Sequence, residues 1–204
     1  MEIRQLTNDD IEEFSALIID MYAHLENLEW FSPMPYDYEN VKNMINKDRF
    51  YIIGAFEGDT LCGVSSLDYK CGKLIGKIDF PKDCNTNSLV EIGFNMVHSE
   101  HRGKGIMKQM VEHLLNKITN DGFEWAFSKV HKDNFASSKS LIKNGFEIFN
   151  AYAKPVNKKE FIDLSSQDFF SEGGKEKAKA TLKKFKDQED IIVDYNILVK
   201  KIKD

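Results

Sequence analysis

The sequence predicts an α/β fold, in which strands and helices alternate along one compact domain. Short apolar runs bounded by Gly, Pro, Asn or Asp alternate with longer segments whose apolar residues recur at helical spacing. At 204 residues the chain suits one domain with embellishments, and its 42% hydrophobic residues, with 15 Phe among them, can form a packed core. There is no internal repeat or low-complexity linker, so we expect a single domain over residues 1–204.

A short strand and two helices are expected at the start of the chain. Residues 2–6 are a strand candidate, and Asn8 or Asp9 is expected to cap the helix that follows. The apolar residues of this helix recur at helical spacing: Ile11, Phe14, Leu17, Ile18, Met21 and Leu25. Residues 30–37 hold two prolines among aromatics, which predicts a loop, and residues 38–46 favour a second short helix.

A hairpin is expected next, followed by a stretch without a clear pattern. The β-rich runs RFYIIGAFEG and TLCGVSSLDYK meet at Glu57-Gly58-Asp59-Thr60, which predicts the hairpin turn. Residues 71–88 contain Gly, Pro and Asn without a clean period. We therefore expect a loop there, or an irregular extension of the hairpin.

Two strand-turn-helix units are expected in the second half. The run LVEIGFNMV, residues 89–97, is apolar on both faces, as in a central strand covered on both sides. After HSEHRGKG, an amphipathic helix ends near Asp121-Gly122, and its apolar stripe is Ile106, Met107, Met110, Val111, Leu114, Leu115 and Ile118. The strand FEWAFSKV and a helix from Asp133 or Asn134 to Asn144-Gly145 repeat this order.

The tail is expected to add to the sheet. FEIFNAYA predicts a strand, and the Lys-rich residues 174–186 predict a helix with Ala178, Leu182 and Phe185 on one face. The run IIVDYNILV then predicts a closing strand.

Composition argues against several classes of protein. Lys plus Arg number 28 against 33 Asp plus Glu, and the net charge of -5 provides no global basic field for nucleic acid. The N-terminus lacks a secretory signal pattern, and no stretch approaches membrane-spanning length. Cys62, Cys71 and Cys84 form no CxxC pair or zinc-type spacing, so we expect free thiols and no metal. We therefore expect a cytoplasmic monomer or homodimer with no nucleic-acid or membrane partner.

The segment Arg102-Gly103-Lys104-Gly105 stands where a buried strand turns into a helix. Glycines let the backbone approach a ligand closely, and the unpaired amides of a helix's first turn can bind an anion. A pyrophosphate fits such a turn, with Arg102 and Lys104 adding charge at its rim. The same residues also occur in ordinary surface turns. Neither the P-loop pattern nor the GxGxxG fingerprint is present.

Two motifs at the right separation make the stretch from Leu89 to Phe146 resemble the GCN5-related N-acetyltransferase (GNAT) superfamily. The family's pyrophosphate signature R/Q-x-x-G-x-G/A is matched from Arg102 to Ile106 and departs at Met107. The segment VHKDNFASSKSLIKNGFE is similar to the second family motif, and its matching residues are Val130, Asn134, Ser137, Gly145 and Phe146.

The resemblance implies a fold and a reaction. It implies a GNAT-like domain with a central mixed, mostly antiparallel sheet flanked by helices, to which this chain adds a C-terminal helix and closing strand in residues 155–204. It also implies an acetyl-CoA-dependent N-acetyltransferase, in which acetyl-CoA is the co-substrate and a small-molecule amine or amino-acid derivative is the acceptor.

The resemblance assigns a set of residues to the cofactor. In the family the central strand splays from its neighbour and pairs with the pantetheine arm, and a later Asn contacts that arm. The implied cofactor residues are Asn95, Met96, Val97, Arg102, Gly103, Lys104, Gly105, Ile106, Met107, Asn134 and Ser137. Met96 and Val97 are equally compatible with plain sheet core, and Asn134 with a helix cap.

Catalysis requires a neutral amine, whereas an alkyl ammonium has a pKa of about 10.4, so a base must take its proton. Glu91 occupies the position at which several members of the family carry a catalytic glutamate, so the resemblance implies a catalytic role for it. An acid in so apolar a run is costly unless it is hydrogen-bonded or faces a wet cleft. We expect Glu91 to act directly or through water, the alternative being an edge position turned to solvent. The loop histidines His98, His101 and His131 are weaker candidates.

Two further expectations follow from the resemblance. Many family members have a Tyr that protonates the leaving thiolate seven residues after the motif Asn, but this chain has Leu141 there, so Tyr152 or water is expected to substitute. Acceptor pockets in the family use the loop between the first two helices and the last strands, which implies a pocket built from Trp30, Phe31, Tyr36 and Tyr38, with Tyr152 as a further candidate. The acidic residues Glu29, Asp37 and Glu39 are candidates for attracting a cation; these side chains would equally serve as a core lid.

Other functions stay open at this point. The missing Tyr and the altered Met107 are also compatible with a non-catalytic acyl-CoA-binding module. Acetylation of a protein or peptide amine is another alternative. The Lys-rich segment 175–186 is compatible with a docking face, although such runs are usually solvated helix.

Overall fold

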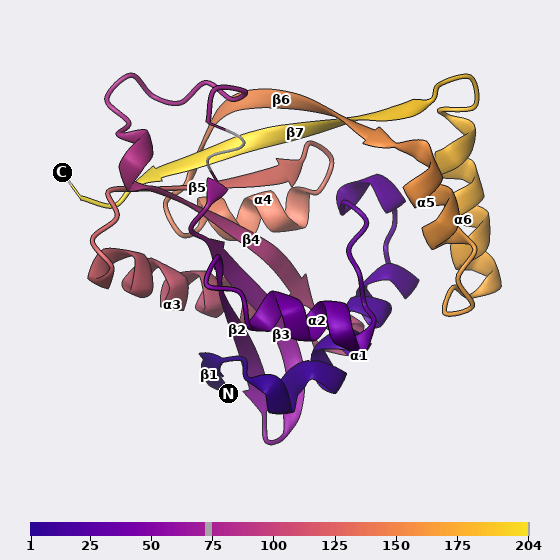
Figure 1. Ribbon diagram of the computed structural model, residues 1–204, viewed down its shortest axis with the longest axis horizontal. Coiled ribbons are helices and arrows are strands. Elements are labelled where there is room, and N and C mark those ends of the chain that lie inside the picture. The colour runs from indigo at the N-terminus through magenta and orange to yellow at the C-terminus, as the bar shows by residue number, and fades with distance from the viewer. Residues whose placement is uncertain (72–74, 204) are drawn as a thin grey trace.

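The computed structural model describes residues 1–71 and 75–203, so residues 72–74 of the expected 71–88 loop and Asp204 lie outside the described chain. Its centre is a seven-stranded sheet in the order β1-β2-β3-β4-β5-β7-β6 (Figure 1). Only the β4–β5 pair is parallel among the described strands, which confirms a mixed, mostly antiparallel sheet. The strands are β1 Glu2–Gln5, β2 Phe50–Glu57, β3 Thr60–Asp68, β4 Leu89–Val97, β5 Trp125–His131, β6 Glu147–Asn157 and β7 Asp190–Lys201.

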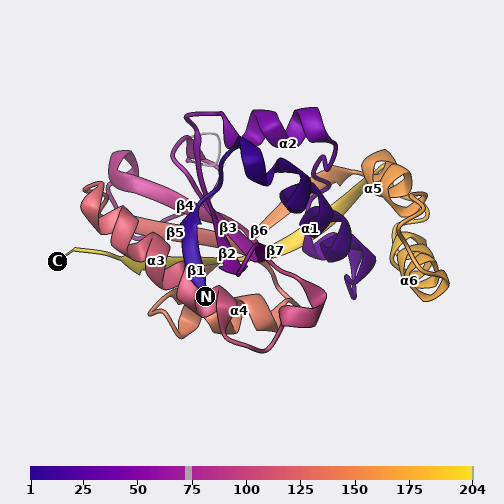
Figure 2. The same cartoon turned by 90° about the horizontal axis from the view of Figure 1, so that it is seen from below.

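Helices cover both faces of the sheet. In Figure 2, α1 and α2 lie on one face, α3 and α4 on the other, and α5 and α6 stand together beyond one end of the sheet. The helices are α1 Ile11–Ala23, α2 Tyr38–Ile45, α3 Ile106–Asn120, α4 Phe135–Ile142, α5 Lys158–Ser165 and α6 Glu172–Lys183. Short 3-10 turns occur at η1 Asn8–Asp10, η2 Leu28–Trp30, η4 Thr86–Ser88 and η5 Ser99–His101. In the described chain, no helix has the length and apolar character that crossing a bilayer requires.

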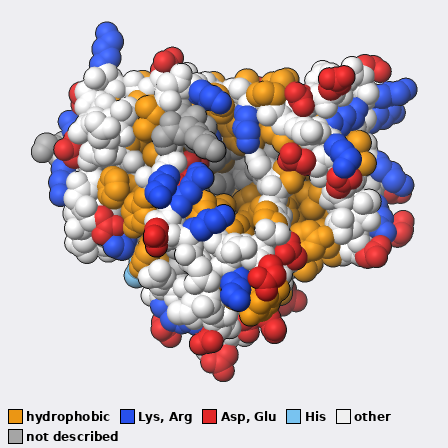
Figure 3. All heavy atoms as spheres, viewed as in Figure 1, with side chains coloured by type: hydrophobic (Ala, Val, Ile, Leu, Met, Phe, Trp, Pro, Cys, Tyr) orange, Lys and Arg blue, Asp and Glu red, His pale blue; other side chains and the backbone are white. Residues whose placement is uncertain are grey.

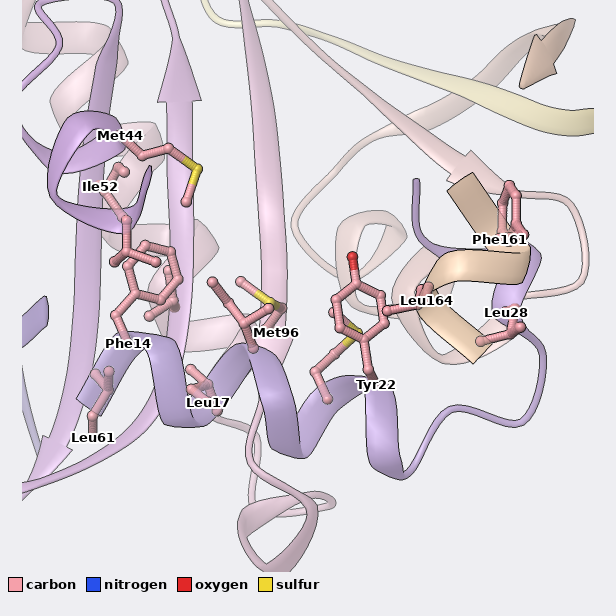
Figure 4. Close-up of a cluster of buried hydrophobic side chains, with 14 of the residues drawn as sticks. Phe14, Leu17, Tyr22, Leu28, Met44, Ile52, Leu61, Met96, Phe161 and Leu164 are labelled. Carbon is pink, nitrogen blue, oxygen red and sulfur yellow. The ribbon is translucent and has the colours of Figure 1, made fainter. Parts of the chain in front are cut away.

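The predicted apolar stripe of α1 packs on the sheet. Phe14 and Leu17 point towards Ile52, Leu61 and Met96 of the strands, as Figure 4 shows. At the other end of α1, Tyr22 is fully buried beside Leu164 of α5 (Figure 4). Burying side chains of this size contributes about 1.5–3 kcal/mol each. The α1 face and the far helix pair therefore share one core.

The start of α1 differs from the expectation. Thr7, rather than Asn8 or Asp9, is the cap, and it begins the 3-10 turn η1. Thr7 and Asp10 form a capping box, and Asp10 also accepts hydrogen bonds from Arg4 at 2.6 and 2.8 Å. The hydrogen bonds from Arg4 hold the pKa of Asp10 below its usual range. The predicted cap was wrong because three candidate residues adjoin one another and only the fold pairs Asp10 with Arg4.

The C-terminal part completes the sheet in an unexpected order. The expected closing strand forms as β7, but it lies between β5 and β6 and pairs with both in antiparallel fashion. Strand β6 is longer than the sequence indicated, and the helix α5 was not predicted. The predicted Lys-rich helix forms as α6, with Ala178 buried. Because β7 lies between β5 and β6, the tail contributes to the same sheet as the first half of the chain.

Candidate functional site

Strands β4 and β5 separate along their length. They pair only from Leu89 to Glu91 on β4, against Trp125 to Phe127 on β5, and then diverge (Figure 1). Just past this point Ser128 on β5 donates a hydrogen bond of 2.8 Å to the carbonyl of Ile92. The backbone of β4 beyond Ile92 is therefore left unpaired towards β5 in the described sheet.

A bulge lies in β4 where the two strands have parted. Phe94 has a positive φ of 50°, and the β3–β4 register shifts between Val64 and Ser66. Such a φ is strained for an aromatic residue, and backbone strain of this kind concentrates at functional sites. The hydroxyl of Ser65 donates to Oδ1 of Asn95 at 2.6 Å. Of the sequence-predicted residues here, Asn95 has its side chain held, Met96 is buried in the core and Val97 is half-buried.

The glycine-bearing turn follows β4 directly. Gly103 and Gly105 have φ values of +79° and +78°, the left-handed region that favours glycine, and a Cβ at either would meet open space. Gly105 is the N-cap of α3, and the first intrahelical bond runs from the amide of Gln109 to its carbonyl. The first-turn amides, including those of Ile106 and Met107, therefore have no partner within the helix. This arrangement can bind an anion.

The basic side chains of the turn do not lie over the helix end. Arg102 donates to the carbonyls of Val97 and His24, at 3.3 and 3.4 Å. The Nζ of Lys104 lies 3.3 Å from Nδ1 of His101. Met107 is half-buried against the core, so its side chain leaves the helix start open. The turn thus presents backbone amides first and cationic side chains at its edge.

A residue that sequence reasoning missed anchors this turn. Asp20, near the end of α1, accepts hydrogen bonds of 2.8 Å from both the amide and the hydroxyl of Ser99. His24 and His98 also approach its carboxylate, at 3.0 and 3.6 Å. The only sequence signal was an acidic residue near a helix end, 79 residues from Ser99. Asp20 therefore fixes the position of the turn relative to α1.

The second motif lies at the start of α4. Asn134 is the N-cap, and its side chain accepts from the amide of Ser137 at 3.2 Å, so the capping role that the sequence allowed is present. Leu141 is buried, and it supplies no hydroxyl. Phe135, which the sequence did not single out, is 73% exposed. An aromatic side chain this exposed is available to a ligand that binds at the start of α4.

Glu91 lies on the sheet face that carries α1 and α2. Its carboxylate is 3.3 Å from Nζ of Lys129, and its strand neighbour Asp68 forms an ion pair with Arg49. Burial raises the pKa of Glu91, and the charge of Lys129 opposes that shift. The solvent-turned alternative is excluded, because Glu91 is 9% exposed. A buried carboxylate with a raised pKa is suited to accepting a proton near neutral pH.

Two tyrosines and a histidine share this face. Tyr195 on β7 is the register partner of both His131 on β5 and Tyr152 on β6, so the three side chains project to one side. His131 is buried, and burial lowers its pKa, whereas burial raises the pKa of Tyr195. Sequence reasoning missed Tyr195, since only the position of β7 between β5 and β6 brings it here.

Of the loop residues expected to bind the acceptor, Trp30 belongs to η2, which contacts β5. Trp30 is half-buried and its Nε1 has no hydrogen-bond partner in the described chain. Phe31 packs on the α1 core, and Tyr36 donates to Gln167 at 2.6 Å. Tyr36 therefore also fastens the linker between α5 and α6.

Two of the three acidic residues considered beside them have structural partners, whereas Glu39 is exposed in the first turn of α2. Glu29 is buried and pairs with Lys184 at 2.9 Å. Asp37 caps α2 through the amide of Asn40. Neither carboxylate is thus left open to attract a cationic acceptor.

Three potential metal ligands meet beside the glycine turn. Ligand atoms of Glu57, Cys62 and His101 all lie within 4.8 Å of one another. Sequence spacing did not show this, because Cys62 and His101 are 39 residues apart. Burial raises the pKa of the Cys62 thiol, and Lys104 adds a positive charge next to His101. Both effects oppose binding of a cation.

Comparisons with known proteins agree with this geometry. A family model described as an acetyltransferase (GNAT) domain matches residues 1–147. None of the curated protein sequences matches this chain significantly.

Solved structures share the fold over nearly the whole chain. An N-acetyltransferase from Staphylococcus aureus Mu50 is 16% identical, with a TM-score of 0.65 and coverage of 99% of this chain and 98% of that one. PaiA N-acetyltransferase from Thermoplasma acidophilum, in complex with coenzyme A, is 19% identical, with a TM-score of 0.58 and 98% coverage of both chains. The putative acetyltransferase yncA from Salmonella typhimurium, with its cofactor acetyl-CoA, is 14% identical, with a TM-score of 0.61 and coverage of 100% and 95%.

Proposed function

The chain belongs to the GNAT acetyltransferase family, and from that premise we propose that it transfers an acetyl group from acetyl-CoA directly to a primary amine of a small molecule or amino-acid derivative. The observation that carries the proposal is the opening between β4 and β5, with Glu91 buried on one face and the unpaired amides of α3 at its end. An open strand edge offers hydrogen bonds to an extended amide-bearing arm, and a helix N-terminus favours phosphate.

The cofactor is proposed to follow this opening. Its pyrophosphate would meet the amides from Gly103 to Met107, with Arg102 and Lys104 at the rim. Its pantetheine arm would pair with the backbone from Asn95 to Val97. Asn134 and Ser137 at the start of α4, together with exposed Phe135, would border the arm on the β5 side.

Glu91 is proposed as the general base. It takes one proton from the acceptor ammonium, directly or through a water, and the neutral nitrogen then attacks the thioester carbonyl carbon. A C–N bond forms and the C–S bond breaks, so the acetyl group leaves the sulfur of CoA. A tyrosine hydroxyl gives its proton to the leaving thiolate and is restored by the second proton lost from the nitrogen, which yields the amide and free CoA thiol.

The thiolate needs a proton donor, and two tyrosines compete for that role. Tyr152 was the sequence candidate and lies on the Glu91 face. Tyr195, opposite it on β7, is more buried, and its raised pKa keeps the hydroxyl protonated over the working pH range. We include both in the proposal, with Tyr152 also lining the acceptor cleft beside Trp30, Phe31 and Tyr36.

Two further parts of the proposal concern the whole chain. The sheet continues through β7, which supports a single domain over residues 1–204 with 155–204 as its completing extension. The three cysteines are free, which favours a reducing compartment such as the cytoplasm.

An acceptor screen that follows release of free CoA thiol tests the function. We expect acetyl-CoA-dependent thiol release with at least one class of small primary amine. Binding of acetyl-CoA without thiol release from any small amine or peptide would instead support a non-catalytic binding module. Release only with peptide or protein amines would move the acceptor to that class.

A further inference from the structure

Lysines surround Glu91 on the acceptor face of the sheet. Lys129, two residues beyond Phe127 on β5, has its Nζ 3.3 Å from the Glu91 carboxylate. Lys154 on β6 is two residues beyond Tyr152 and so projects to the same face. Figure 3 shows Lys and Arg side chains gathered near the middle of this face, beside a hollow that apolar side chains border on the other side.

Lys154 is the member of this group without a counter-ion. It is half-buried, and no carboxylate lies within 4.0 Å of it among the described residues. The charges of Glu91 and Glu160 reach it only from further away, while burial and the charges of Lys129 and Lys77 lower its pKa. A partly desolvated ammonium among other ammonium groups is unfavourable, and a bound anion relieves that cost.

The positive charges of Lys129 and Lys154 also disfavour an acceptor that carries only a positive charge. An acceptor ammonium must approach Glu91 to lose its proton, and that approach brings it close to Lys129. Repulsion between the two ammonium groups opposes binding unless the acceptor carries its own negative charge nearby. The nearby carboxylate of Asp68 does not offset this repulsion, since Arg49 already pairs with it.

Resting on the proposed function, we propose that the acceptor is a zwitterion of the α-amino acid type, whose carboxylate is held by Lys154 and Lys129 while its ammonium faces Glu91. Lys129 then interacts with two carboxylates, that of Glu91 and that of the acceptor. The acceptor's carboxylate draws Lys129 from Glu91, which leaves Glu91 a stronger base once substrate is bound. The acceptor therefore completes the charge balance of the cleft.

Matched acceptors test this. We would measure kcat/KM for a panel of α-amino acids, their carboxamides and their decarboxylated amines, each corrected for the fraction of neutral amine. We expect the carboxylate members to exceed both partners by roughly 10- to 100-fold, the effect of one charged hydrogen bond. Carboxamides or bare amines that equal or exceed the amino acids would overturn the proposal, even though their acetylation would still support the enzyme's function.

Lys154→Met keeps the aliphatic stem and removes the charge. It should raise KM for amino acids by roughly 10-fold or more and leave the carboxamides unchanged, while Lys154→Arg retains most of the preference. Lys179→Met, which changes an exposed lysine on α6, is the control. An equal loss on both acceptor classes in Lys154→Met would show a structural lysine and contradict the assignment. Absence of transfer to every acceptor, with wild-type protein, would instead reject the proposed function itself.

Discussion

The two sides of the β4–β5 opening are built in different ways. On the proposed cofactor side, the groups available to a ligand belong to the backbone of one short segment, in which β4, Gly103, Gly105 and the start of α3 follow one another. On the proposed acceptor side, they are side chains from separate strands, such as Glu91, Lys129 and Lys154. A backbone site is formed by local conformation, whereas a side-chain site needs sheet order and register to be settled first.

This contrast explains why the cofactor can be inferred from the family, whereas the acceptor cannot. The backbone amides of a helix start bind phosphate whatever the neighbouring side chains are, so departures such as Met107 leave the chemistry intact. The acceptor is selected by charge and shape, and these change with single substitutions. We therefore expect the cofactor to be common to the family and the acceptor to be particular to this chain.

Substitution of Glu91 is expected to have the largest effect, and it acts on the acceptor side alone. Glu91→Gln keeps shape but loses basicity, so kcat should fall by about 10²- to 10⁴-fold with acetyl-CoA affinity nearly unchanged. Burial raises the pKa of Glu91, so in the wild type the base is present above that raised value and is lost as pH falls through it. The acid limb of the kcat profile should thus lie above the ordinary Glu pKa of about 4.3 and disappear in the variant.

The loss in Glu91→Gln should shrink as pH rises, because more of the acceptor is then already neutral. Glu112→Gln, a partly exposed glutamate of α3 paired with Lys108, is the matched control. A small effect independent of pH would mean that another group or water is the base. A large drop in melting temperature with normal turnover would make Glu91 structural.

On the cofactor side, a substitution in the glycine-bearing turn is expected to weaken binding of acetyl-CoA. Gly105→Val forces a β-branched residue into a φ of +78°, which costs about 1–3 kcal/mol or displaces the turn. We expect the Kd for acetyl-CoA, measured by calorimetry, to rise roughly 10- to 100-fold. Gly122→Val carries the same strain at the far end of α3, where φ is +84°, and should lose stability without losing affinity. If the two variants had the same Kd for acetyl-CoA, the segment from Arg102 to Gly105 would be an ordinary surface turn.

The smallest effect is expected where α1 supports the turn. Asp20→Asn weakens two charge-assisted hydrogen bonds to Ser99, so the Kd for acetyl-CoA should rise roughly 3- to 10-fold while acceptor preference stays the same. Asp163→Asn, on the exposed surface of α5, should leave affinity unchanged. A change in acceptor preference in Asp20→Asn would show that the two sides of the opening are coupled rather than separately built.

Local patterns predicted most of the elements correctly. The stripe of α1, the hairpin at Gly58 and the strand, turn and helix from Leu89 to Asn120 form as expected, because periodicity and turn chemistry act over a few residues. The failures lie where several local solutions compete or the pattern is weak. The side-chain cap is Thr7, at the start of the 3-10 turn η1 that precedes α1, and α5 escaped notice within a polar segment.

The sequence by itself determined the family, most of the elements and the glycine turn, since these depend on hydrogen bonds and side-chain spacing within short stretches. Only the tertiary structure decided that β7 lies between β5 and β6, which brings Tyr195 beside Tyr152 and His131. It also decided that Glu91 meets Lys129 and that Lys154 has no carboxylate within 4.0 Å among the described residues. Contacts between distant strands depend on sheet order and register, and no local pattern encodes either.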